Sequence, residues 1–198
     1  RWLALRDNYL GGNYDEHTRP LLAALDLFQH AVDQAGLTST EDVWRLVAKT
    51  AYGRHVPVAH VTIKLRFDNP IAWIQEFNQI PPEQEVDCLK RTIERIETDL
   101  QPMRQRANLW SVGDIDGLRA MRYPDDRVTC FNALFSVRRM HDQLSRAEAQ
   151  LNDAWLTAAD NALNKNASSF AVLPLGELLK PDGWLSKLRA KGYVIKDP

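Results

Sequence analysis

Histidine and cysteine, the residues that most often bind transition metals or act as nucleophiles, are scarce in this chain. It has five histidines and two cysteines in 198 residues. No HExxH motif and no Cys/His cluster with zinc-ligand spacing is present. A G-x-S-x-G motif and a glycine-rich phosphate loop are also missing. The chain therefore carries none of the common sequence signatures of zinc peptidases, serine hydrolases or nucleotide-binding proteins. The histidines are His17, His30, His55, His60 and His141.

An excess of one charge sign and long apolar runs are missing as well. The formal net charge is -1, so no overall field attracts nucleic acid, and we expect no nucleic-acid partner. No apolar run approaches the roughly 20 residues of a membrane-spanning helix, so we expect no transmembrane segment. The chain is 44% hydrophobic and 26% charged, which is typical of a globular protein. Because repeats and linkers are absent, we expect a single domain over residues 1–198.

The two cysteines, Cys88 and Cys130, allow two interpretations. An even number is compatible with one disulfide in an oxidising compartment. Two buried free thiols would fit the same spacing. The residues alone leave both open.

Helical periodicity dominates the chain. An apolar stripe follows Pro20 and ends at Gly36, where glycine suits the C-terminal end of a helix. Asp68 or Asn69 can cap a helix that starts at Pro70. Similar signals predict further helices. A long helix over about 83–112 should bend near Asp99 because of Pro102. A short helix should be capped by Asp114, and a helical region over about 127–165 should break near His141.

Three stretches favour strands because they are rich in β-branched or apolar residues. They predict a helix-rich α/β fold, in which a small β-sheet is covered by many helices. Three strands are few for so many helices, so we expect a segment preceding Arg1 to complete the sheet. The predicted strands are Val56–Leu65, Ser169–Leu175 and Tyr193–Lys196.

One acidic residue follows the second of these strands. Glu177 comes directly after Gly176, and ligands of open α/β sheets bind beyond the carboxyl ends of the strands. A carboxylate there could bind a hard metal ion or act as a base. It could equally cap or solvate the loop before Pro181.

Several longer stretches resemble a known family. They are "RANLWSVGDIDGLRA", "LNDAWLTAADNAL", "FAVLPLGELLKPDGWLSKLRAKGYVI", and the two that carry the cysteines, "DCLKRTIERIETDL" and "VTCFNAL". Together the chain resembles the C-terminal two-thirds of the TraB/GumN family domain, in particular the GumN-like proteins of Gram-negative bacteria. The resemblance implies an α/β fold, a secreted precursor with a periplasmic or secreted location, and a disulfide between Cys88 and Cys130. The chain after Cys88 must then turn back along its long helix to reach Cys130.

Some relatives in the family are metal-dependent proteases, but their motif residues are mostly replaced here. The implied late Gly-x-x-His corresponds to Pro174-Leu175-Gly176-Glu177, and the implied Arg-Asn pair corresponds to Leu151-Asn152, followed by a retained Trp155. Val61 stands near the place of the implied central Glu. Leucine cannot supply the positive charge of a guanidinium, and glutamate is a different metal ligand from imidazole.

We therefore expect a catalytically degenerate module, binding or envelope-associated, with no cofactor and with an envelope protein or peptide as partner. Its candidate ligand site comprises Glu177, Gly176 and Asn152. The alternative is a metal-dependent protease or hydrolase in which Glu177 binds manganese, cobalt or zinc in place of the histidine.

Overall fold

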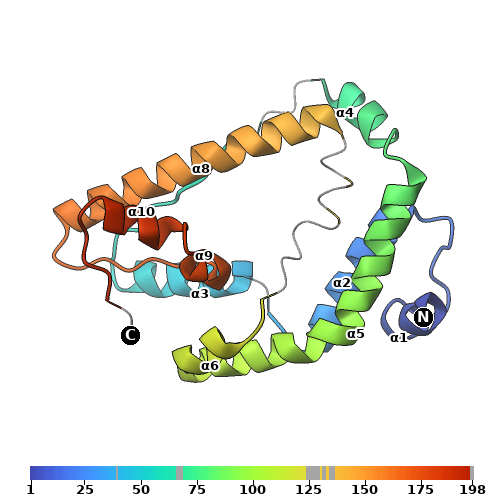
Figure 1. The fold of residues 1–198 in the computed structure, drawn as a ribbon, viewed down its shortest axis with the longest axis horizontal. Helices are drawn as coiled ribbons and strands as arrows, with labels where there is room; N and C mark the ends of the chain where they lie inside the picture. The colour runs from blue at the N-terminus through green and yellow to red at the C-terminus, as the bar shows by residue number, and fades with distance from the viewer. Residues whose placement is uncertain (39, 66–68, 124–129, 131–132, 134–136, 197–198) are drawn as a thin grey trace. The chain divides into compact units, whose positions relative to one another are not determined.

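The structure is a computed structural model that describes residues 1–38, 40–65, 69–123, 130, 133 and 137–196. Its regular elements are helices (Figure 1). The helices are α1 (Trp2–Tyr9), α2 (Pro20–Gln34), α3 (Thr40–Gly53), α4 (Pro70–Phe77), α5 (Pro82–Val112), α6 (Ile115–Ala120), α8 (Arg138–Lys165), α9 (Leu175–Leu179) and α10 (Trp184–Ala190).

The chain divides into two units. The first comprises residues 1–38 and 67–141, with α1, α2, α4, α5 and α6. The second comprises residues 39–66 and 142–198, with α3, α9, α10 and all of α8 from Asp142 onward.

The predicted α/β fold with a small sheet is wrong for the part of the chain that the structure describes, which contains no strand. The segments 56–65, 169–174 and 193–196 have no regular secondary structure. A strand needs a hydrogen-bonded neighbour, which side-chain propensity alone cannot supply. Phe170 and Val194 are each 82% exposed, so these apolar side chains are not buried as a sheet would bury them. Leu175, predicted to end a strand, instead begins α9 after Pro174.

Several predicted helix ends are confirmed. Gly36 follows α2 with a φ of 71°, a left-handed conformation that glycine adopts at low cost. Of the two candidate caps before Pro70, Asn69 is the one used, and its side chain accepts a hydrogen bond from the amide of Ala72 at 3.2 Å. Asp114 caps α6 by accepting from the amide of Gly117 at 2.8 Å.

No helix break lies at His141, contrary to the prediction. α8 already begins at Arg138 and runs through His141 to Lys165. The start predicted at about residue 127 lies outside the described residues. The periodicity therefore identified the helix and its C-terminal end but predicted a break at a residue that lies inside α8.

The long helix α5 bends in its C-terminal half (Figure 1). Pro102 lies inside it and has no amide hydrogen for the preceding turn, as the sequence predicts. Arg106 spans this region, because its guanidinium bonds both carboxylate oxygens of the buried Asp99, at 3.0 and 2.8 Å. The same guanidinium donates to the carbonyl oxygen of Arg122 at 3.1 Å. A bidentate pair that spans the proline is thus bonded to the backbone that follows α6.

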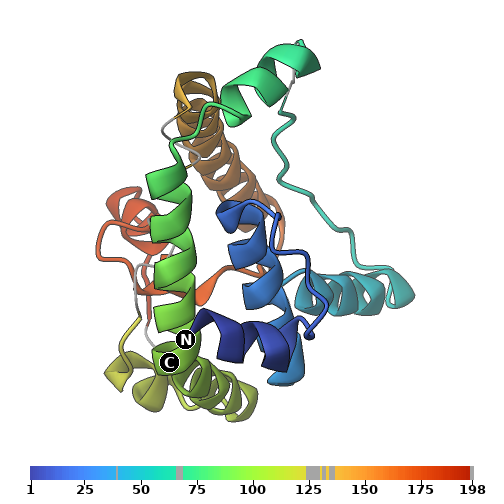
Figure 2. The same ribbon diagram turned by 90° about the vertical axis from the view of Figure 1, so that its right-hand side faces the viewer.

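The first unit is built on the packing of α2 against α5 (Figure 2). Both helices present small and aliphatic side chains at three- and four-residue spacing, which forms one apolar stripe on each. Two neighbouring clusters result. One contains Leu21, Ala24, Ile80, Cys88, Ala133 and Val137, and the other contains Leu27, Ala31, Ile93 and Ile96 with Trp2, Leu5 and Tyr9 of α1 packed against it.

A buried ion pair lies at the N-terminal ends of these two helices. Glu85 of α5 is 3% exposed, and its carboxylate is bonded by the guanidinium of Arg19, with Nε to Oε1 at 3.0 Å. Arg19 also donates to Asn78 Oδ1 and to the carbonyl oxygen of Phe77, each at 3.0 Å, and lies over the Phe77 ring. Glu85 accepts from the amide of Leu21 at 3.4 Å. The pair therefore satisfies polar groups of α2 and of the turn after α4.

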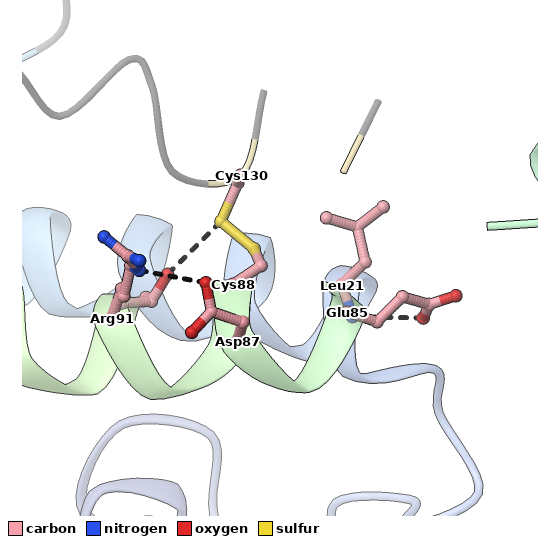
Figure 3. Close-up of a disulfide and its surroundings, with 7 residues drawn as sticks. Leu21, Glu85, Asp87, Cys88, Arg91 and Cys130 are labelled. Atoms are coloured by element: carbon pink, nitrogen blue, oxygen red, sulfur yellow. Dashed lines mark hydrogen bonds and ion pairs between the residues drawn. A yellow bond between two sulfur atoms is a disulfide. The ribbon is translucent and has the colours of Figure 1, made fainter. Parts of the chain in front are cut away.

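The disulfide that the resemblance implies is confirmed. Cys88 of α5 is bonded to Cys130, with 4.7 Å between their Cα atoms (Figure 3), within the usual range for a disulfide. Cys88 is fully buried in the first apolar cluster. The hydroxyl of Thr92, one turn further along α5, lies 3.6 Å from the Cys130 sulfur. The bridge thus joins α5 to the segment that leads into α8.

Candidate functional site

Glu177, the predicted site residue, lies in the first turn of α9 rather than beyond a strand. Pro174 precedes the helix, and its carbonyl oxygen accepts from the Glu177 amide at 2.9 Å. The Glu177 side chain is 14% exposed, and Lys180 Nζ donates to its Oε1 at 2.7 Å. A lysine three residues on lies on the same helix face, which is why the two meet. The carboxylate is therefore already engaged with a cation of the chain itself.

The backbone of Glu177 is held by a close approach to Gly183, the residue before α10. A Cβ atom at Gly183 would overlap the carbonyl oxygen of Glu177 and would come within 3.0 Å of the Lys180 Cβ. Only glycine fits this position without displacing backbone. At Gly176, in contrast, an added Cβ would meet nothing within 4 Å. The steric requirement thus falls on Gly183, which sequence reasoning did not identify, and not on the predicted Gly176.

Asn152 and Trp155 lie three residues apart on one face of α8, and both bind Trp184, the first residue of α10. The Trp184 indole Nε1 donates to Asn152 Oδ1 at 2.7 Å. Its ring stacks on Trp155 with centroids 4.5 Å apart and planes 8° from parallel. Trp184 is only 8% exposed, so its polar N–H needs such a partner. This contact fixes the start of α10 on α8.

A second contact fixes the end of α10. The Tyr193 hydroxyl donates to Asp160 Oδ1 at 2.6 Å and accepts from Asn164 Nδ2 at 3.3 Å. Asn152 and Asp160 are eight residues apart, about 12 Å along a helix. The seven residues of α10 span about 10 Å, which matches this distance. α10 therefore runs parallel to α8 (Figure 1), with Leu188 buried between its two attachment points.

The structure places the predicted site residues in one assembly of α8, α9 and α10. Glu177 is held against Gly183, and Asn152 is bonded to the next residue, Trp184. The sequence did not single out Lys180, Gly183 or Tyr193. The lysine could have been found from its three-residue spacing to Glu177. The contacts of Trp184 and Tyr193 join residues 32 and 33 positions apart, for which local patterns carry no signal.

The Tyr193 contact predicts an alkaline dependence of stability. The hydrogen bond to Asp160, burial and the negative charge of that carboxylate, in this order, raise the pKa of Tyr193. A raised pKa in the folded state means that the contact stabilises fully below the unfolded value of about 10. This stabilisation is lost as the pH rises through the folded-state pKa. We expect the melting temperature of the intact protein to fall more steeply above pH 10 than that of Tyr193→Phe.

Melting curves between pH 7 and 11.5 would test this, with Tyr9→Phe in the first unit as the matched control. Burial also raises the pKa of Tyr14 and Tyr123, but both tyrosines are present in all three proteins. Their contribution therefore cancels in the comparison. Parallel alkaline slopes for the intact protein and Tyr193→Phe would contradict the prediction.

Among the residues that the structure describes, no three side chains of His, Cys, Asp or Glu lie together as metal ligands. None of the described helices is long and apolar enough to cross a membrane.

Comparisons with known proteins give one match. The model of the TraB/PrgY/gumN family matches residues 4–197, nearly the whole chain. No curated protein and no solved structure matches the chain.

Proposed function

Because the chain belongs to the TraB/PrgY/gumN family, we propose that it is a catalytically degenerate member that acts as a binding module of the cell envelope. Its ligand site is the surface around α9 and the start of α10, with Glu177 and Asn152. The partner is an envelope protein or peptide, and no cofactor takes part. The observation that carries the catalytic degeneracy is the engagement of both side chains in contacts within the chain.

The first of these contacts concerns Glu177. This residue stands where the resemblance implies a metal-binding histidine, and its carboxylate is paired with Lys180 at 2.7 Å. A metal ion at this position would have to displace the lysine ammonium or accept a like charge nearby, which weakens cation binding. Carboxylate oxygen is also a harder ligand than imidazole and favours different metals. Both arguments favour loss of the protease chemistry.

The second contact concerns Asn152. Where the resemblance implies an arginine followed by asparagine, the chain has Leu151 and Asn152. Leucine offers no positive charge to stabilise a developing oxyanion. The Asn152 side-chain oxygen accepts from Trp184, so it serves to dock α10. The position that a catalytic pair would occupy is used for packing.

The proposed location of the protein in the cell envelope is supported by its disulfide. Disulfides form and persist in secreted and periplasmic proteins and are rare in a reducing cytosol. The Cys88–Cys130 bridge, in which Cys88 is fully buried, thus supports a periplasmic or secreted protein.

Metal analysis of the full-length protein tests the proposal. The protein is purified, equilibrated with manganese, cobalt or zinc, desalted, and its metal content measured by mass spectrometry. Glu177→Ala is compared with Glu148→Ala, an exposed glutamate on α8, and circular dichroism checks that both variants fold. We expect less than about 0.1 equivalents of metal in each protein. One equivalent that is lost on Glu177→Ala and kept in Glu148→Ala, together with peptidase activity, would establish the metal-dependent hydrolase instead.

A further inference from the structure

Basic residues are distributed unevenly along this chain. The whole chain has a formal net charge of -1, but the stretch from Leu163 to Lys196 has six lysines and arginines against two acidic residues. Asp197 follows Lys196 in the sequence and lies outside the described residues. A locally basic surface can therefore exist although the molecule as a whole is nearly neutral.

Only part of this positive charge is neutralised. Lys180 is paired with Glu177, and Lys191 lies 3.7 Å from Asp160. Lys165, Arg189 and Lys196 are exposed and form no ion pair with any residue that the structure describes. Lys165 ends α8, Arg189 lies in the last turn of α10, and Lys196 follows it closely in sequence. These three cations are therefore available to a partner.

Apolar side chains are exposed at the same end of α8. Phe170 and Val194 are each 82% exposed, and Leu163 is 45% exposed. Ser169, next to Phe170, donates to the carbonyl oxygen of Ala162 at 3.3 Å. Tyr193, next to Val194, is bonded to Asp160 and Asn164. Both apolar residues thus follow residues that are anchored on the last turns of α8, where the two chain segments come together (Figure 1).

We propose that these six residues form a C-terminal patch that docks on an anionic lipid surface. The patch comprises Leu163, Phe170 and Val194 with Lys165, Arg189 and Lys196. Exposed aromatic and aliphatic side chains enter the boundary between headgroups and acyl chains, and nearby lysines and arginines bind lipid phosphates. A nucleic acid would match the cations but would leave Leu163 and Val194 without a suitable contact. The combination of both residue types therefore favours an anionic membrane.

The inference rests on the proposed function for the compartment only, because an envelope protein has such a membrane within reach. It is independent of whether the site around Glu177 holds a metal. It also requires no membrane-spanning element, since a surface patch lies on the bilayer and does not cross it.

Vesicle sedimentation of the full-length protein tests the inference. The probes are vesicles of phosphatidylcholine alone and vesicles with 40% phosphatidylglycerol. We expect binding to the anionic vesicles only, weakened by salt. Neutralising all three cations, as Lys165→Gln, Arg189→Gln and Lys196→Gln, should weaken binding about a hundredfold, since each charge contributes about fivefold. The matched control neutralises Lys64, Lys90 and Arg104, which are also exposed, and should bind nearly as the intact protein does.

A second pair of variants tests the apolar part. Phe170→Ser with Val194→Ser should weaken binding at least about tenfold. Ile71→Ser with Val112→Ser, at residues 68% and 78% exposed in the first unit, should leave it unchanged. The inference is overturned if the anionic vesicles are not bound, if both lipid compositions are bound equally, or if patch and control variants lose binding alike. A dimer that disappears in Phe170→Ser/Val194→Ser, measured by light scattering, would also overturn it, because a second copy would then cover the patch.

Vesicle binding and metal content are measured separately, so the two proposals fail separately. A stoichiometric metal at Glu177 with intact vesicle binding would contradict the degenerate site and support the patch. A metal-free protein without vesicle binding would contradict the patch alone.

Discussion

Replacing both Cys88 and Cys130 by alanine should lower the free energy of unfolding of the first unit by about 4 kcal/mol. The bridge joins residues 42 positions apart, and closing a loop of this length in the unfolded chain accounts for about that amount in the chain-entropy model. Because whole domains are stable by only about 5–15 kcal/mol, this loss would leave the unit marginal. Urea denaturation would measure the free energy of unfolding, and hydrogen exchange would show which helices lose protection.

The effect should be local to the unit that contains the bridge. Cys88 lies in the apolar cluster formed by α2 and α5, so amides of these helices should lose protection first. Amides of α10 and of α8 from Asp142 onward belong to the second unit and should keep theirs. The control is reduction of the intact protein by a small phosphine, because this gives the same unbridged chain without a substitution. Equal loss of protection in both units would contradict this assignment.

Removing Arg19 should be comparably destabilising. Arg19→Met would leave the carboxylate of Glu85 buried without its cation, and breaking a buried pair in this way costs about 3–5 kcal/mol. The variant would also leave Asn78 Oδ1 and the Phe77 carbonyl oxygen without their hydrogen-bond donor. We expect a lower urea midpoint with an unchanged slope, since the surface exposed on unfolding stays the same.

The double variant Arg19→Met/Glu85→Leu separates the charge from the contact. Replacing both partners removes the unpaired charge, so much of the lost stability should return, as for other buried pairs exchanged for apolar residues. The exposed pair of Asp87 and Arg91 on α5, substituted in the same way, is the matched control and should change stability by less than about 1 kcal/mol. An Arg19→Met variant no less stable than this control would show that the buried pair contributes nothing.

The helices of this chain could largely be predicted from the sequence because their signals are local. Pro20, Asn69 and Asp114 act within one turn of the helix starts that they mark. The strands could not, because Val56, Phe170 and Val194 indicate only that a residue suits a strand. Whether a strand forms depends on a neighbour, and the described part of the chain places none beside these segments.

The candidate site was predicted only in part. Sequence reasoning identified Glu177 from its place after a predicted strand and Asn152 through the family resemblance, and the structure shows where each lies. It did not identify Gly183, whose role depends on the approach of a backbone oxygen six residues earlier. Nor did it identify Tyr193, whose partners lie on another helix. Contacts of this kind arise from packing, and packing is the part of the fold that local sequence patterns do not encode.

The guanidinium of Arg106 has a mechanical consequence for α5. A proline inside a helix usually creates a hinge, because one backbone hydrogen bond is missing there. Here the Arg106 guanidinium donates hydrogen bonds to Asp99, on the other side of the proline, and to the carbonyl oxygen of Arg122, beyond α6. Straightening the helix would break a buried bidentate pair, so we expect the Arg106 contacts to stiffen the bend at Pro102.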